Sequence, residues 1–320
     1  MFDKTDSLIV ELTTACNLRC VHCAYWRSNA TFLEHDLYAY LLRDFVKSGL
    51  QTVMFSGGEP LLHPIFTKFM KTTKDYGLKI KVASNGTLLC NDVFLSNVKD
   101  IDELIVSLDA DCLEVYQDIR GINYFKHIEQ SLYKISTNIN RPEKMSASFL
   151  IQHGNFRCLP GFISLCKDFK LNSVSILVPN RGGDFQRFYK LDEYAQRVYL
   201  NKQEQLFFLN EVFPIIEHEY IKNPSFFNFG KNHLAVICKS VCFLLFPEDQ
   251  KFRKSICSLP LRTAFLYSDG TITLCPYRNG KLNCNISDLP NIIARERAKM
   301  LFLGVNDTLR CYTCLEVPLD

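Results

Sequence analysis

The feature that most constrains this chain is the alternation of short apolar runs with amphipathic patterns over its first 180 residues. The runs SLIVEL, QTVMFS, KIKVAS, ELIVSL, MSASFLI and SVSILV begin near residues 7, 51, 79, 103, 145 and 173. Nearly continuous apolar runs are typical of parallel strands covered on both faces. Apolar residues between them recur at helical spacing, as at Leu37, Leu41, Leu42 and Phe45. The pattern predicts an α/β fold with six right-handed β/α units, which form a partial (β/α)6 TIM-like barrel or an open sheet because a full barrel needs eight.

The pattern changes after the sixth run. Residues 191–223 predict a long helix that Pro214 kinks or breaks, and residues 224–256 read as irregular and rich in aromatic side chains. The segment AFLYSDGTITLCP predicts a hairpin, because Asp269-Gly270 is a strong turn dipeptide. We therefore expect a barrel, a helical linker and a small cysteine-bound domain at residues 1–190, 191–256 and 257–320.

Composition excludes several classes of protein. The net charge of +3, from 37 basic and 34 acidic residues, is too balanced for a chain whose main work is holding nucleic acid. No apolar run reaches the roughly 18 residues that a membrane span needs. The N-terminus, MFDKTDSLIVEL, does not read as a secretion signal, so we expect a cytoplasmic protein. Fourteen cysteines in a reducing compartment indicate metal binding rather than disulfides.

The first apolar run leads directly into the cysteine loop, TTACNLRCVHCAYW, in which Cys16, Cys20 and Cys23 have the spacing C-x3-C-x2-C. Three thiolates on one short loop can hold three corners of an iron–sulfur cube and leave the fourth iron open to a ligand. A structural zinc loop that uses a distant fourth ligand is the alternative. The loop follows a strand, and β/α arrays place their chemistry at the carboxyl ends of strands.

Further motifs follow the next strands. They are Gly57-Gly58-Glu59-Pro60, Ser84-Asn85-Gly86-Thr87, and Ser107-Leu108-Asp109-Ala110 with the later Ile119-Arg120-Gly121. Each motif alone is weak, but their order after C-x3-C-x2-C is specific. On these motifs, residues 7–180 resemble the radical S-adenosylmethionine (radical SAM) superfamily.

The resemblance implies a [4Fe–4S] cluster on Cys16, Cys20 and Cys23 that binds the amino and carboxylate groups of S-adenosylmethionine (SAM). It implies that the GGEP segment holds the methionine amino group, and that a serine and Arg120 meet the methionine carboxylate. His22 and the backbone at Val178 would lie against the adenine. The expected cofactor-binding residues are Gly57, Gly58, Glu59, Pro60, Ser84, Asn85, Ser107, Asp109, Arg120, His22 and Val178.

A second cysteine pattern, C-x12-G-x4-C followed by C-x2-C, lies near the C-terminus. It resembles the twitch domain, the shorter relative of the SPASM domain, and implies a second, auxiliary [4Fe–4S] cluster without an open corner. A zinc ribbon with the same ligands is the alternative, and Cys284 is a possible substitute ligand. The expected ligands are Cys257, Cys275, Cys311 and Cys314.

The resemblance implies reductive cleavage of SAM to a 5′-deoxyadenosyl radical, which removes a hydrogen atom from a substrate. We favour oxidation of the substrate radical through the auxiliary cluster. Epimerisation with a thiol hydrogen donor is the alternative, and a non-catalytic iron–sulfur or zinc-binding protein is the remote one. The expected substrate is a small molecule, such as a sugar or aminoglycoside, or a peptide presented by a partner. The expected reductant is of the flavodoxin or ferredoxin type, and we expect neither membrane nor nucleic-acid partners.

The possible hydrogen donors are Cys238 and Cys242, in the segment ICKSVCF. Cysteines four residues apart share one face if the segment is helical. They also precede the first expected auxiliary ligand by fewer than twenty residues. The competing interpretation is that both are packed as small apolar groups. Cys90, Cys112 and Cys166 are expected to be packing residues.

Overall fold

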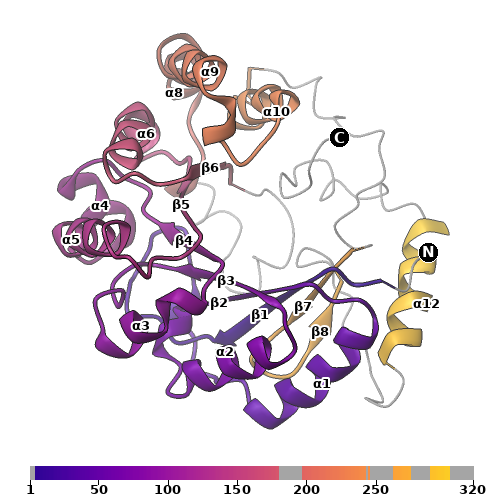
Figure 1. Cartoon of the computed structure of the whole chain (residues 1–320). Coiled ribbons are helices and arrows are strands. Elements are labelled where there is room, and N and C mark those ends of the chain that lie inside the picture. Colours follow the sequence, from indigo (N-terminus) through magenta and orange to yellow (C-terminus); the bar gives the residue numbers. More distant parts are fainter. Residues whose placement is uncertain (1–3, 180–196, 243, 246–261, 275–288, 303–320) are drawn as a thin grey trace.

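The computed structural model describes residues 4–179, 197–242, 244–245, 262–274 and 289–302 (Figure 1). Within these residues the strands form one eight-stranded sheet in the order β6-β5-β4-β3-β2-β1-β7-β8. All neighbouring pairs are parallel except β7 and β8. The strands are β1 (Ser7–Thr13), β2 (Thr52–Gly57), β3 (Lys79–Ser84), β4 (Glu103–Ser107), β5 (Lys144–Leu150), β6 (Ser173–Leu177), β7 (Thr263–Leu266) and β8 (Ile272–Thr273). The predicted α/β class and its six parallel strands are confirmed.

At least one helix follows each of the first five strands, with two after β4, and Figure 1 shows these helices along the outer side of the curved sheet. They are α1 (His35–Lys47), α2 (Phe66–Asp75), α3 (Asp92–Asn97), α4 (Leu113–Arg120), α5 (Phe125–Ser136) and α6 (Leu159–Asp168). Burial alternates along β1, where Leu8, Val10 and Leu12 are fully buried. One face of the sheet therefore packs against the helices and forms the core. The apolar side chains of the strands and of the helices are buried against each other there.

A long helix with a kink or break at Pro214 is expected beyond β6, and in the described residues the helix changes pitch just before the proline. The helix begins as α8 (Lys202–Phe207), makes a π-helical turn at Phe208–Val212, and continues as α9 (Phe213–Lys222). Pro214 lies in the first turn of α9. Proline cannot donate the helical hydrogen bond, and a π turn just before it accommodates the missing donor.

The expectation that residues 224–256 are irregular is wrong for part of the segment. Helix α10 spans Lys231–Val241 and buries Leu234, Ile237, Cys238 and Val241. These positions recur at helical spacing, so the signal is present in the sequence. The start is hard to recognise because the N-cap is Gly230, and no side chain supplies a cap hydrogen bond.

The predicted hairpin forms as β7 and β8, with Leu266 opposite Ile272 and Gly270 at φ 80° in the turn. Strand β7 also pairs in parallel with β1, so this hairpin extends the barrel sheet. Helix α12 (Leu289–Phe302) lies beside the N-terminal end, where Arg297 donates to the carbonyl of Lys4 (Figure 1). The boundary at 257 stays a prediction, because residues 246–261 and 275–288 lie outside the described ones.

None of the helices in the described ranges combines the length and the apolar character that a bilayer crossing requires.

Candidate active site

The cysteine loop at the end of β1 is held against the end of α4 by backbone hydrogen bonds. Arg19 N–H donates to the carbonyl of Arg120 at 3.1 Å, and Val21 N–H donates to the carbonyl of Ile119 at 3.0 Å. Gly121 ends α4 with φ 77°, and a Cβ there would lie 2.5 Å from the carbonyl oxygen of Arg19. The loop and the helix end therefore fit only if residue 121 is glycine.

The cysteine loop carries three thiols that suit a cluster better than a single ion. Cys20 is buried, and Cys16 and Cys23 are partly exposed. Across the described residues, Cys16, Cys20 and Cys23 do not form a group whose ligand atoms all lie within 4.8 Å of one another. A single tetrahedral ion would need these sulfur atoms to move closer together. Three thiols on one short loop are the donor set that an iron–sulfur cube takes, so the chemistry of the residues present fits such a cluster.

Two side-chain nitrogens lie close to the thiols of the cysteine loop, and burial opposes ionisation of Cys16 and Cys23. Arg120 Nη1 lies 3.6 Å from the Cys20 sulfur, and Asn85 Nδ2 lies 3.9 Å from the Cys16 sulfur. Burial raises the pKa of Cys16, and it raises the pKa of Cys23 to about 12. In the metal-free chain these thiols are protonated, so loading of a metal must release protons.

The two glycines after β2 allow a close approach to the cysteine loop. A Cβ on Gly57 would lie 2.4 Å from the carbonyl oxygen of Thr13, and one on Gly58 would lie 2.3 Å from that of Ala15. The backbone N–H groups of Gly58 and Glu59 donate to these same carbonyls at 2.8 Å. Side chains at 57 and 58 would push β2 away from the loop.

Glu59 is fully buried and joins the ends of β2 and β3. Its carboxylate accepts hydrogen bonds from the Leu61 N–H at 3.1 Å, the Ser84 hydroxyl at 3.0 Å and the Asn85 N–H at 2.7 Å. Burial raises the pKa of Glu59 to about 7. Pro60 starts the short helical turn that follows. The Glu59 carboxylate therefore links the end of β2 to the end of β3 by hydrogen bonds. The sequence motif alone does not show these bonds.

The side chain of Asn85 is also held in place. Its Nδ2 donates to Asn17 Oδ1 at 2.8 Å, and its Oδ1 accepts from Thr87. Asn17 in turn donates to the Thr87 hydroxyl at 2.7 Å. Sequence reasoning missed Asn17, whose only signal is that it lies next to Cys16.

Asp109 and Arg120 form a buried ion pair. Arg120 Nη2 lies 2.6 Å from Asp109 Oδ2, and the side chains are 6% and 3% exposed. The other carboxylate oxygen accepts from the Leu150 N–H at 2.7 Å, and Asp109 adopts φ 59°. Arg120 Nε is buried and has no hydrogen-bond partner in the part of the chain that is described. The pair therefore leaves one donor for a ligand.

His22 lies in the cysteine loop, next to Cys23 and 3.9 Å from Asp109. Burial, helped by the charge of Arg120, lowers the pKa of His22 to about 4, so its ring is neutral at pH 7. The ring nitrogen Nδ1 lies 3.1 Å from Nε2 of Gln152, a fully buried side chain. Gln152 Oε1 is buried without a partner among the described residues.

Gln152 is the second residue that sequence reasoning missed. Its signal is its place two residues after β5, the one strand end for which no residue was named. Two expected residues occupy neighbouring strand ends. Ser107 accepts a hydrogen bond from Ser148 at 3.3 Å, and Val178 is buried directly after β6.

Cys238 and Cys242 lie on α10 and at its C-cap, and both are buried. The segment is helical, and the N–H of Cys242 donates to the carbonyl of Cys238 at 2.9 Å. The Cys242 thiol lies 3.5 Å from the carbonyl oxygen of Gln205 on α8. The arrangement is that of packed cysteines, and a role as hydrogen donors stays a prediction. Cys257, Cys275, Cys311 and Cys314 lie outside the described residues.

Comparison with protein families matches residues 10–153 to the Radical SAM superfamily. The chain is 24% identical to the tungsten-containing aldehyde ferredoxin oxidoreductase cofactor-modifying protein of Pyrococcus furiosus, over 72% of this chain and 67% of that one. It is 23% identical to a GTP 3′,8-cyclase of Synechocystis, over 96% and 89%. It is 32% identical to the AdoMet-dependent heme synthase of Methanosarcina barkeri, but over 35% of this chain and only 33% of that one.

Solved structures share the fold. The SAM-bound SuiB of Streptococcus suis has a TM-score of 0.67 at 14% identity, over 91% of this chain and 65% of that one. The enzyme anSMEcpe, with AdoMet and the Cp18Cys peptide bound, has a TM-score of 0.64 at 16% identity, over 91% and 80%. The matched region 10–153 contains the cysteine loop and the motifs that follow β2, β3 and β4. Motif geometry, family match and fold therefore agree: residues 10–153 of this chain form a region of the radical SAM type.

Proposed function

We propose that this enzyme cleaves SAM reductively and oxidises a substrate from which the 5′-deoxyadenosyl radical has removed a hydrogen atom. The match of residues 10–153 to the radical SAM superfamily implies SAM and one [4Fe–4S] cluster. The observation that carries the proposal is the meeting of two buried networks at the cysteine loop. One network joins Glu59 and Asn85 to the loop, and the other joins Asp109 and Arg120 to it.

In this proposal Cys16, Cys20 and Cys23 hold the cluster. When bound, the cluster and SAM supply the electron transfer and the radical. The chain itself binds, orients and excludes water. Arg120 Nε and Gln152 Oε1 are buried without partners in the described residues, so a ligand can use one as a donor and the other as an acceptor.

The carboxylate of Glu59 already accepts three hydrogen bonds from the chain. We therefore assign it a positioning role, in which it fixes Ser84 and Asn85. The backbone of Gly57, Gly58 and Pro60 would meet the methionine amino group. Ser107 and Arg120 would meet the methionine carboxylate, and the neutral ring of His22 suits an uncharged base such as adenine.

The oxidation step is proposed to use an auxiliary cluster on Cys257, Cys275, Cys311 and Cys314. Its support is the cysteine spacing, which resembles that of a twitch domain. The substrate is proposed to be a small molecule or a peptide. The named relatives include a GTP cyclase and a heme synthase, whereas a structure of SuiB holds the precursor peptide SuiA. A flavodoxin or ferredoxin would supply the first electron.

Epimerisation is the second candidate, because Cys238 and Cys242 offer two thiols close together on one helix face. The outcomes differ in the mass of the product. Oxidation removes two hydrogen atoms, whereas epimerisation in heavy water adds one deuterium without changing connectivity.

The test begins with anaerobic reconstitution, reduction and addition of SAM. The wild-type chain should release 5′-deoxyadenosine and hold about eight irons, as two [4Fe–4S] clusters require. Replacing Cys16, Cys20 and Cys23 together by Ala should abolish the 5′-deoxyadenosine and leave about four irons. Zinc in place of the remaining iron would overturn the auxiliary cluster and leave SAM cleavage standing.

A further inference from the structure

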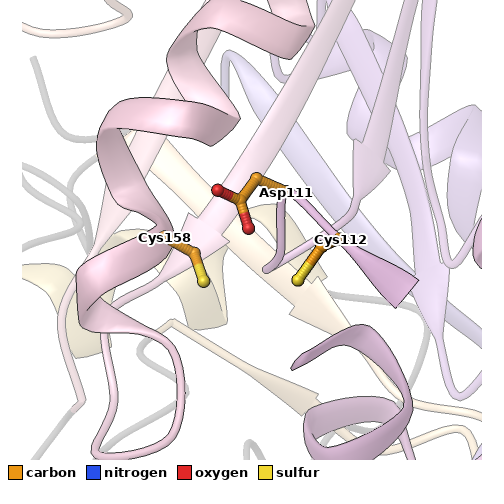
Figure 2. A group of neighbouring side chains, drawn as sticks. All are labelled: Asp111, Cys112 and Cys158. Carbon is orange, nitrogen blue, oxygen red and sulfur yellow. The ribbon is translucent and has the colours of Figure 1, made fainter. Parts of the chain in front are cut away.

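A second group of metal-ligating side chains lies at the ends of β4 and β5, apart from the cysteine loop. Asp111, Cys112 and Cys158 place one carboxylate oxygen and two sulfur atoms within 4.8 Å of one another. Figure 2 shows these atoms turned toward a common space from two separate segments. All three residues are partly exposed, so an ion can reach them from solvent.

Both sulfur atoms of this group lie at helix starts. Cys112 is the N-cap of α4, and its side chain makes no capping hydrogen bond. Cys158 is the N-cap of α6, likewise without a side-chain capping hydrogen bond, and its sulfur lies within 4.8 Å of a carboxylate oxygen of Asp111. Burial and the neighbouring carboxylate of Asp111 raise the pKa of both thiols, so metal binding at this group must release their protons.

The carboxylate of Asp111 occupies space that only a glycine leaves open. A Cβ at Gly161, in the first turn of α6, would lie 2.0 Å from Asp111 Oδ2. Any larger residue at 161 would drive the carboxylate away from the two sulfur atoms. Asp111, in the β4–α4 loop, and the first turn of α6 therefore lie in close contact. This contact keeps the three ligand atoms near one another before any metal binds.

We propose that Asp111, Cys112 and Cys158 bind a divalent thiophilic ion of the zinc class, with solvent at its fourth position. Two thiolates select a soft or borderline ion over calcium or magnesium. Zinc bonds of about 2.3 Å to sulfur and about 2.0 Å to oxygen put tetrahedral ligands about 3.5–3.8 Å apart. Atoms within 4.8 Å reach that spacing by small side-chain rotations. The ion would tie the β4–α4 loop to the start of α6, and this inference does not depend on the proposed function.

The direct test uses the full chain with its iron–sulfur clusters already loaded, so that the cluster cysteines are occupied. Cobalt(II) is added anaerobically as the probe and then displaced by zinc. We expect one further equivalent of cobalt, with sulfur-to-metal charge-transfer bands and the visible bands of a tetrahedral site. Cys112→Ser and Cys158→Ser should each weaken cobalt binding at least about 100-fold, because a ligand is lost.

Cys90→Ser is the matched control. Cys90 is also partly exposed, and it donates to the Ser131 hydroxyl rather than to this group. Its variant should bind the extra cobalt like wild type. Equal cobalt affinity and spectra in wild type and the Cys112→Ser/Cys158→Ser double variant would overturn the proposal.

A measurement on the wild-type chain avoids any loss of folding in the variants. Alkylation of Cys112 and Cys158 is followed by peptide mass spectrometry with and without zinc. At a zinc concentration about 100 times Kd, both rates should fall about 100-fold, because only the metal-free site reacts. The rate at Cys90 should not change. Unprotected Cys112 and Cys158 at saturating zinc would refute the site.

Discussion

Replacing Asp109 by Asn should destabilise the chain by about 3 kcal/mol, although the two side chains have nearly the same shape. Asn tolerates the left-handed backbone of this position, φ 59°, and keeps an oxygen for the Leu150 N–H. What is lost is the charge 2.6 Å from Arg120 Nη2. The guanidinium then stays buried without its counter-charge.

The magnitude follows from burial. Both side chains of the pair are at least 94% buried, so water cannot replace the missing carboxylate. Removing one partner of a buried pair costs about 3–5 kcal/mol. We expect a cost at the lower end of this range, because Asn keeps the hydrogen bond from the Leu150 N–H and still places a polar group next to Arg120.

The assay is anaerobic urea unfolding of the metal-free chain, comparing midpoints at equal slopes. The matched control is Glu219→Gln, which removes the charge of a pair with the exposed Lys167. Surface pairs contribute about 0–1 kcal/mol, so this variant should stay close to wild type. If Asp109→Asn lost no more stability than Glu219→Gln, the reasoning about the buried pair would be refuted.

Three further predictions concern Gly58, Glu59 and the two cysteines of α10. Gly58→Ala should cost about 1–3 kcal/mol in urea unfolding, because its Cβ meets a backbone oxygen at 2.3 Å, whereas the Cβ of Gly230→Ala meets nothing within 4 Å and this variant should cost less than about 1 kcal/mol, as an N-cap change does. Glu59 has a folded pKa of about 7 against 4.5, so its own contribution to stability falls as pH rises from 4.5 to 7, whereas that of His22 rises in both proteins. The stability of wild type relative to Glu59→Gln should therefore fall over this range, and parallel pH profiles of the two proteins would contradict this. If epimerisation is the reaction, Cys238→Ala or Cys242→Ala should still release 5′-deoxyadenosine but form no epimer, and full turnover by both variants would exclude these donors.

Features written in consecutive residues could be predicted. The six strands, the cysteine loop and the hairpin at Asp269-Gly270 each have a local pattern, and the described residues form them. Pairings between distant segments could not. Nothing near Thr263 indicates that β7 adds to the sheet next to β1, because both are simply short apolar runs.

The same limit applies to the candidate site. Sequence reasoning directed Glu59 and Arg120 toward a ligand, and the structure gives both of them partners within the chain. A motif identifies a polar side chain at a strand end, but its hydrogen-bond partner depends on three-dimensional distance. Cys112 was expected to be a packing residue, and only the fold brings it close to Cys158, which is 46 residues away.

The most direct measurement of the central claim is electron–nuclear double resonance of the reduced cluster with SAM labelled in its amino nitrogen or carboxylate oxygen. An open iron held by Cys16, Cys20 and Cys23 predicts a hyperfine coupling from each labelled atom. The chain with all three replaced by Ala should show neither coupling, even where its remaining iron is intact. An unchanged spectrum of the wild-type cluster on saturation with SAM, without coupling from either label, would contradict the account.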